Sequence, residues 1–177
     1  MSNVMLGYHK LYGFVRDPEM ATPGSACFDL RSYFGDKQSI ECIDPRGHKV
    51  TVPIVQAKVD DVWCNMIDIP PKHTAKIPTG LIFEIPHGYA VKVYGRSGLS
   101  MRGLPLANSV GIIDSDYREE IFILLRNVND SGFVLKHDDR VAQMNVERVC
   151  ATNLVEISDK PDRIGTRSGG FGSTGVN

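Results

Sequence analysis

Apolar and polar residues alternate along several short runs of the chain, with the period of two that is typical of β-strands. In residues 49–54 the apolar side chains share one face, and Pro53 predicts that this strand lies at the edge of a sheet. Residues 141–149 alternate in the same way, so that every second side chain would face the core and Gln143 would face away. We therefore expect strands that each bury one face.

Three further apolar runs predict more strands, and turn residues separate them. Residues 81–85 and 89–94 are joined through Pro86-His87-Gly88, and residues 121–125 form a continuous apolar run typical of a buried strand. The best candidate for a helix is short, residues 97–103, with Gly103 as its C-terminal stop. Proline and glycine recur at short intervals between the runs, which predicts an all-β sandwich or barrel.

The composition fits one globular domain and excludes several classes of protein. The 177 residues carry a net charge of −1, so the overall charge favours neither nucleic acid nor an acidic membrane as a partner. The first residues lack the basic and apolar regions of a signal peptide, and no apolar run approaches the roughly 20 residues that span a bilayer. We therefore expect a cytoplasmic protein, in the host cytoplasm if the chain is viral.

The four cysteines and five histidines are isolated from one another in the sequence. The cysteines include no C-x-x-C pair, and the histidines form no H-x-x-x-H or H-x-E pattern. A bound transition metal is therefore not expected, whereas a magnesium ion that enters with a phosphate substrate is compatible with this pattern. Without a secretory signal, the cysteines are expected to be reduced thiols.

Two carboxylates and a phenol lie within four positions in the segment Asp114-Ser115-Asp116-Tyr117. In an extended chain Asp114 and Asp116 point to the same side, and a hairpin arm that ends in the buried strand 121–125 would hold them still, as catalysis requires. A solvated turn is the alternative, because Asp and Ser are common turn residues.

Three other segments carry polar residues near the ends of predicted strands. Asp29 lies among apolar residues at the start of a strand, where an exposed carboxylate is the simpler alternative. Arg96, Ser97 and Gly98 connect a strand to the predicted helix, whose free amides suit a phosphate. Arg96 would add a positive charge or bind a neighbouring carboxylate, and an ordinary N-cap formed by Ser97 is the alternative. Gln143 lies on the polar side of its strand.

The C-terminal residues 163–177 are rich in glycine and hydroxyl side chains, and we expect them to form a flexible tail. They lack the lysine of the nucleotide-binding pattern G-x-x-x-x-G-K-[ST]. Arg167, Ser173 and Thr174 could still donate to phosphate, and Phe171 could stack on a base. A disordered tail without such a role is the alternative.

Taken together and in this order, five segments of the chain resemble the five motifs of the trimeric dUTPase family (deoxyuridine 5′-triphosphate nucleotidohydrolase). The segments are 23–32, 95–100, 111–121, 140–146 and 167–175. The sequences R-S-G-L, G-x-I-D-S-D-Y and G-G-F-G-S-T-G within them are highly specific, and the resemblance extends from near residue 20 to the C-terminus.

The resemblance implies a jelly-roll-like β-fold, a homotrimer whose three active sites each use all three chains, and hydrolysis of dUTP to dUMP and pyrophosphate with magnesium. It implies that Asp114 activates the attacking water and that Tyr117 lies under the deoxyribose and excludes a 2′-hydroxyl. Asn108 and backbone groups near Gly111 would recognise uracil, and Asp29 would place the metal through water. The remaining implied substrate contacts are Arg96, Ser97, Gly98 and Gln143 near the phosphates, and Arg167, Phe171, Gly172, Ser173 and Thr174 in the tail.

The chain departs from the family pattern in two places. Glu119 occupies a position where the family usually has glycine, so an unusual backbone angle there would disturb the segment that carries Asp114. Extra residues lie between the first two motifs, and we expect them to form an inserted surface arm within 33–69 that carries Trp63. The expected organisation is a β domain of residues 1–162 followed by a C-terminal lid of residues 163–177.

Two other functions are open at this point. A dCTP deaminase-like enzyme would share the fold, but such enzymes lack the D-S-D-Y segment and the aromatic glycine-rich tail, which argues against this function. A regulatory protein that binds dUTP and docks a protein partner through the arm is compatible with intact catalytic residues.

Overall fold

All regular elements but one are β-strands in the computed structural model, which describes residues 4–165. The strands are β1 (Gly7–Lys10), β2 (Glu19–Met20), β3 (Phe28–Arg31), β4 (Ser39–Ile43), β5 (Lys49–Pro53), β6 (Val55–Val59), β7 (Val62–Ile69), β8 (Thr74–Pro78), β9 (Leu81–Glu84), β10 (Tyr89–Tyr94), β11 (Val110–Ile113), β12 (Phe122–Arg126), β13 (Phe133–Lys136) and β14 (Arg140–Arg148). The one helix in this range is α1 (Ser97–Met101), and it is too short to cross a membrane. The predicted all-β fold with one short helix is therefore confirmed.

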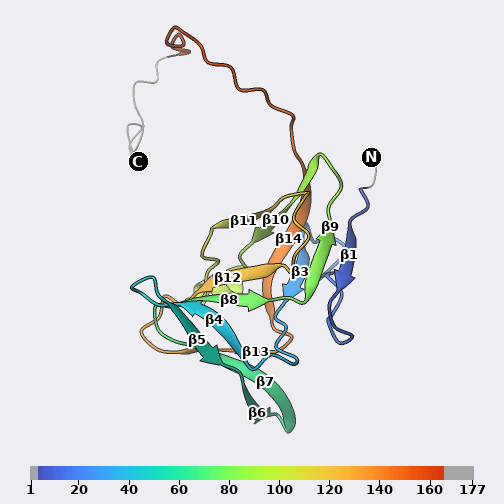
Figure 1. Ribbon diagram of the computed structural model, residues 1–177, viewed down its shortest axis with the longest axis vertical. Helices are drawn as coiled ribbons and strands as arrows, with labels where there is room; N and C mark the ends of the chain where they lie inside the picture. Colours follow the sequence, from blue (N-terminus) through green and yellow to red (C-terminus); the bar gives the residue numbers. More distant parts are fainter. Residues whose placement is uncertain (1–3, 166–177) are drawn as a thin grey trace.

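Antiparallel pairing arranges these strands in four sheets that share one core (Figure 1). The largest sheet has the order β11-β10-β14-β3-β2, and the second has the order β12-β8-β4-β5. The smaller sheets β13-β7-β6 and β1-β9 complete the arrangement. Many neighbouring strands, such as β14 and β3, are far apart in sequence, so the fold depends on long-range pairing, as in jelly rolls and barrels.

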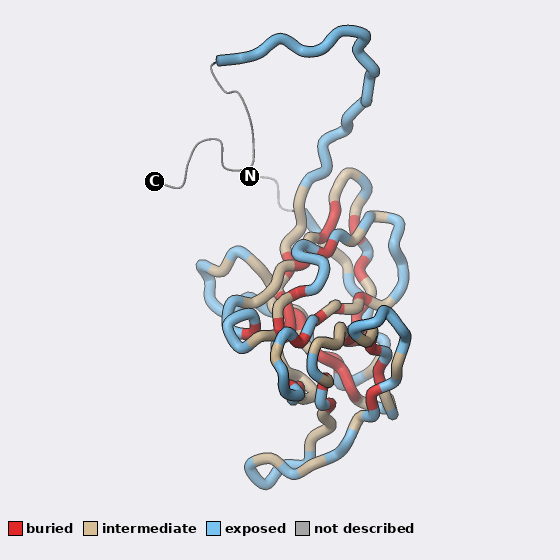
Figure 2. Tube along the Cα trace, turned by 90° about the vertical axis from the view of Figure 1, so that its left-hand side faces the viewer, coloured by how far each residue is buried: buried red, intermediate tan, exposed pale blue. Residues whose placement is uncertain are grey.

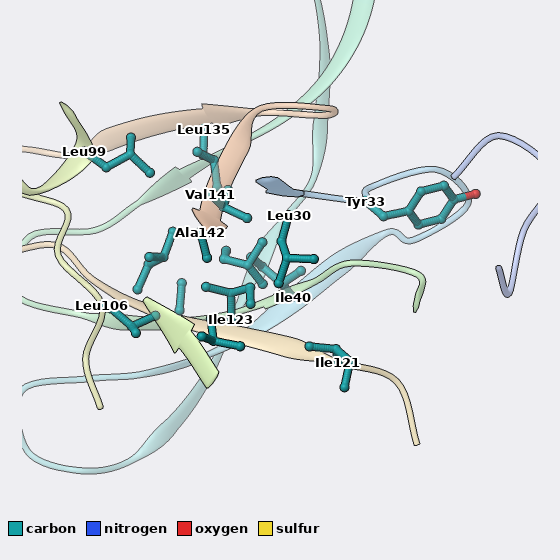
Figure 3. Packing of buried hydrophobic residues seen from close by; sticks show 14 of the residues in the cluster. Leu30, Tyr33, Ile40, Leu99, Leu106, Ile121, Ile123, Leu135, Val141 and Ala142 are labelled. Atoms are coloured by element: carbon teal, nitrogen blue, oxygen red, sulfur yellow. The ribbon is translucent and has the colours of Figure 1, made fainter. Parts of the chain in front are cut away.

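The core forms where the apolar faces of these sheets meet. Leu30, Ile40, Ile123 and Ala142 come from four different strands and lie together in Figure 3. The pleat of each strand decides which side chains arrive there: in β14, Ala142 is buried, whereas Gln143 on the opposite face is only partly buried, as predicted.

Helix α1 ends close to the predicted position. The helix itself stops at Met101, with Arg102 as its C-cap, and is therefore two residues shorter than the predicted range 97–103. Gly103 follows with a φ of +83°, a left-handed angle that glycine adopts without steric penalty. Its role as the stop of the helix is confirmed.

The segment 33–69 forms a surface arm only in part. β4 pairs with β8, which places Cys42 opposite Ala75, and both Ile40 and Cys42 are buried. β5 pairs with β4 at the edge of the same sheet, as Pro53 predicted, and Val52 is buried too. These two strands belong to the body because the second sheet needs their apolar faces, so the arm is much smaller than the segment.

The element that projects is the hairpin of β6 and β7, which extends below the body in Figure 1 and is mostly exposed in Figure 2. Asp60 and Asp61 form its turn with φ values of 48° and 65°, and two positive values are typical of the type I′ turn that fits the strand twist. Val62 and Trp63 next to the turn are 66% and 64% exposed. From Ile67 onward β7 belongs to the core.

Beyond β14 the chain leaves the body. Residues 149–165 form no strand and run outward in Figures 1 and 2. Leu154 and Ile164 on this segment are 95% and 97% exposed. Neither side chain therefore packs against the body of the described chain.

Candidate active site

One end of the largest sheet brings together polar residues from three of the predicted segments. The strand register places Asp29 of β3 opposite Gln143 of β14, and Gln143 opposite Tyr94 at the end of β10. Residues opposite each other in a sheet share a face, so these side chains are neighbours. Arg96 follows two residues after Tyr94 at the same end of β10. Long-range pairing thus creates a single site from residues that are distant in sequence.

Two arginines hold the carboxylate of Asp29 from both sides. Nε of Arg96 lies 3.1 Å from Oδ1 of Asp29, and Nη1 of Arg140 lies 3.2 Å from Oδ2. Nη1 of Arg96 also donates to the main-chain carbonyl of Arg140 at 3.0 Å, which fixes the two arginines relative to each other. The side chain of Asp29 is only 13% exposed, so it is not the simple solvated carboxylate of the alternative reading. The cluster of Arg96, Arg140 and Asp29 carries one net positive charge, which suits an anion.

Gln143 and the start of α1 complete this cationic end. Nε2 of Gln143 donates to the carbonyl of Gly95 at 3.2 Å, which ties β14 to the entry of the helix. The N-cap of α1 is Arg96, without a side-chain cap hydrogen bond, so the alternative in which Ser97 caps the helix is wrong. Ser97 and Gly98 form the first turn and are exposed, where a phosphate could approach their amides.

Asn108 and Gly111 approach each other closely at the start of β11. A Cβ added to Gly111 would lie 3.2 Å from Nδ2 of Asn108 and 3.2 Å from Cβ of Val93. Ser109, between them, has a φ of +59° and turns the chain sharply. The missing side chain at position 111 therefore allows the Asn108 amide to fold against the sheet.

Asp114 lies at the other end of the sheet. The register pairs Ile113 of β11 with Val91 of β10, so Asp114 follows beside Ala90, near the start of β10. Asp114 and Asp116 are both exposed. They line a cleft together with Ser115, the segment 87–90, Val149 and Ala151.

The connection that carries Asp114 and Tyr117 joins two sheets and is not a separate hairpin arm. β11 pairs with β10, whereas β12 pairs with β8, so the expected hairpin is corrected. Ile121 fixes the far end, because its N–H donates to the carbonyl of Leu81 at 2.8 Å. Glu119 is exposed and does not have a positive φ, so its departure from the family glycine causes no backbone strain.

Tyr117 is fixed through its own hydroxyl. Its Oη donates to the main-chain carbonyl of Glu120 at 3.0 Å, and the residue is 38% exposed. Burial raises the pKa of Tyr117, and the negative charges of Glu119 and Glu120 raise it further. The phenol therefore stays protonated near neutral pH and keeps its donor role.

Arg140 is a site residue that the sequence analysis did not assign. In a regular strand Arg140 and Gln143 would point to opposite faces, because three positions separate them. The register of β14 against β3 shifts between Arg140 and Ala142, and this irregularity allows Arg140 to reach Asp29. The only signal in the sequence was the position of Arg140 in the same segment as Gln143.

The remaining predicted contacts, all in the tail, lie outside the described residues: Arg167, Phe171, Gly172, Ser173 and Thr174. Within residues 4–165 no group of three or more His, Cys, Asp or Glu side chains could hold a metal ion. Both oxygens of the Asp29 carboxylate already face a guanidinium group. This donor set does not fit direct coordination of a metal ion by several side chains.

Known proteins match both the sequence and the fold. The model of the dUTPase family matches residues 57–175. A deoxyuridine 5′-triphosphate nucleotidohydrolase of Desulfitobacterium hafniense (strain DSM 10664 / DCB-2) is 38% identical over 162 residues, which cover 90% of this chain and 87% of that protein. A protein of the same name from Roseobacter denitrificans is 44% identical over 120 residues, 65% of this chain and 78% of its own length. The solved Staphylococcus bacteriophage 80alpha dUTPase with dUPNHPP has a similar fold, with a TM-score of 0.72 over 98% of this chain and 100% of that chain, at 19% identity.

Proposed function

The chain belongs to the dUTPase family, the dUTP diphosphatases, and we propose that it hydrolyses dUTP to dUMP and pyrophosphate. This reaction removes dUTP from the nucleotide pool and supplies dUMP for dTMP synthesis. The observation that carries the proposal is the convergence of Asp29, Arg96 and Gln143 at the start of α1, because three separate family motifs meet there. The names of the curated relatives favour this activity over that of a dCTP deaminase.

In the proposed chemistry Asp114 is the general base. Its exposed carboxylate takes a proton from a water molecule, whose oxygen attacks the α-phosphorus. The bond between the α-phosphorus and the bridging oxygen breaks, and pyrophosphate leaves with that oxygen. Negative charge grows on the phosphate oxygens, and the guanidinium groups of Arg96 and Arg140 and the amides at Ser97 are arranged to stabilise it.

Magnesium, when bound with the nucleotide, supplies further charge neutralisation on the phosphate oxygens. Asp29 is the residue that would orient it through water, and the two arginines hold the Asp29 carboxylate in one place. For the nucleoside, Tyr117 would lie under the deoxyribose, and Asn108 with the backbone at Gly111 would recognise the uracil ring.

We further propose that the active site is completed by other copies of the chain, in a homotrimer. Asp114 lies beside Ala90 and Arg96 lies beyond Tyr94, at opposite ends of β10. Four strand residues span about 13 Å, whereas an attacking water must lie about 3–3.5 Å from its phosphorus. Within one chain Asp114 is thus too far from Arg96 to activate water next to a phosphate bound there. The outward segment 149–165, with its exposed apolar side chains, supports an exchange of C-terminal segments between copies, which would bring Phe171 and Arg167 over a neighbour's nucleotide.

The test is a pyrophosphate-release assay with dUTP, dCTP and UTP under the same conditions. Preferred turnover of dCTP or UTP by the wild type would overturn the proposed substrate. Asp114→Asn should lower kcat by roughly 10²–10⁴-fold with little change in nucleotide binding, since the shape of the residue is kept and the base is lost. Asp116→Asn, in the same cleft, is the matched control, and equal losses in both variants would show that Asp114 is not the specific base.

A further inference from the structure

Glu120, which is not among the predicted site residues, lies three residues after Tyr117 in the same segment. Its side chain is only 11% exposed. Oε1 accepts a hydrogen bond from the N–H of Gly80 at 2.8 Å, and Oε2 lies 3.6 Å from Nζ of Lys37. Glu120 is thereby held from two directions, by the turn after β8 and by the loop that leads into β4.

The backbone on the far side of Glu120 is fixed as well. Ile121 donates through its N–H to the carbonyl of Leu81 at 2.8 Å, and its own carbonyl accepts from Oγ1 of Thr79 at 2.7 Å. Ile121 is fully buried, and in Figure 3 it lies where the chain enters β12. Residues 120 and 121 are therefore the well-anchored end of the loop between β11 and β12, whereas residues 116–119 of this loop are exposed.

The position of the Tyr117 side chain depends on these anchored residues. Its hydroxyl donates to the carbonyl of Glu120 at 3.0 Å, and this is the one side-chain hydrogen bond of Tyr117 within residues 4–165. Any movement of the Glu120 backbone consequently moves the acceptor that holds the far end of the phenol ring. Functional side chains need placement to within about 0.5 Å, which requires such a supporting contact.

We propose that Glu120 is a positioning residue for Tyr117, and that Lys37 extends this support to the loop before β4. The inference rests on the proposed function, in which Tyr117 discriminates between deoxyribose and ribose in the substrate. The carboxylate oxygens of Glu120 face Gly80 and Lys37, so its role is to fix the acceptor for the Tyr117 hydroxyl, and the ammonium group of Lys37 neutralises the largely buried carboxylate. Selection of the sugar is thereby linked to a segment that contains none of the five motifs.

The chain offers a matched control in the neighbouring residue. Glu119 has the same side chain, but it is exposed, and its carboxylate forms no ion pair within the described range 4–165. Both Glu119→Gln and Glu120→Gln remove one negative charge beside Tyr117. A general electrostatic effect would appear in both variants, whereas a positioning effect would appear only at Glu120.

The experiment compares kcat/KM for dUTP and UTP in the wild type, Tyr117→Ala, Glu120→Ala, Glu120→Gln, Lys37→Met and Glu119→Gln. Glu120→Ala should narrow the dUTP/UTP ratio by about tenfold or more, since small misplacements at an active site change rates by such factors. Glu120→Gln and Lys37→Met should narrow the dUTP/UTP ratio less. The glutamine still accepts a hydrogen bond from the N–H of Gly80, and the methionine keeps the packing of the aliphatic part of the Lys37 side chain. Glu119→Gln should leave the ratio unchanged.

The assembly of each variant is checked by mass, and its unfolding by urea. A purely structural defect would lower stability or total activity without changing the ratio. An unchanged ratio in assembled Glu120 variants, or equal narrowing in Glu119→Gln, would overturn the proposal. If Glu120→Ala does not assemble, the Glu120→Gln and Lys37→Met ratios decide. If the wild type does not hydrolyse dUTP, or Tyr117→Ala keeps the wild-type ratio, the proposed function itself fails, which is a different outcome from failure at Glu120 alone.

Discussion

Shortening the β6–β7 hairpin should leave the enzyme folded and active, and this result would separate the arm from the body of the protein. Gln56 and Asn65 are opposite each other in the hairpin, so residues 57–64 can be replaced by Asn-Gly in a two-residue type I′ turn. Asn65 must be kept, because its Nδ2 donates to the carbonyl of Gly35 at 2.9 Å and its own carbonyl accepts from the N–H of His137 at 2.7 Å.

The expected cost of this change is small. The apolar residues removed at the turn, Val62 and Trp63, are about two-thirds exposed, so the shortened chain loses little buried surface. Replacement of residues 35–65 by a Gly/Ser loop is the contrasting variant, because it also removes Ile40, Cys42 and Val52, which are 5%, 0% and 7% exposed. Burial of such a side chain contributes about 1.5–3 kcal/mol, so three of them approach the whole stability of a domain, roughly 5–15 kcal/mol.

The assays are urea unfolding, mass of the assembly and dUTP hydrolysis, each with the full-length chain as the reference. The shortened hairpin should keep assembly and hydrolysis within a few-fold, whereas the variant that lacks 35–65 should not fold. A folded, assembled but inactive short-hairpin variant would show that the hairpin contributes to the active site. A variant without 35–65 that unfolds like the wild type would refute the assignment of β4 and β5 to the body.

Three further predictions concern stability and the sharing of the site. Burial lowers the pKa of His137, whose Nδ1 accepts from the N–H of Phe34 at 2.9 Å. Below pH about 6.5 the unfolded chain therefore takes up more protons at this residue than the folded chain, and the free energy of unfolding should fall as the pH drops through this range. His137→Asn keeps a hydrogen-bond acceptor but does not titrate, so the free energy of unfolding measured with urea should depend less on pH in this variant. Asn127 is fully buried and donates to three main-chain carbonyls at 2.8, 2.9 and 3.2 Å, so Asn127→Leu should lower the free energy of unfolding by about 3 kcal/mol or more, and a loss below about 1 kcal/mol would contradict this account. Mixed assemblies of Asp114→Asn chains and chains that lack residues 165–177 should be more active than the sum of the two separate variants; activity equal to that sum, with mixing checked by mass, would argue against a shared site.

The sequence by itself determined the local structure and the chemical groups. The alternation in 141–149, the apolar run 121–125 and the glycine at 103 each predicted an element that the structure contains, because side-chain period and backbone preference act between near neighbours. The segment from Asp114 to Tyr117 and the Asp29 and Arg96 positions were identified in the same way, since these motifs are continuous in the chain. The family that they resemble is the one to which the chain belongs.

The tertiary structure alone decided which of these groups meet. Arg140 reaches Asp29 only because the register of β14 shifts against β3, and the link from Lys37 to Glu120 crosses 83 residues of sequence. β4 and β5 looked like an insertion because nothing local shows that the second sheet needs their faces; their pairing with β8 placed them in the core. Asp114 and Arg96 lie only 18 positions apart, yet β10 holds them at opposite ends, because a paired strand is a rigid spacer whose length the packing of the sheet fixes.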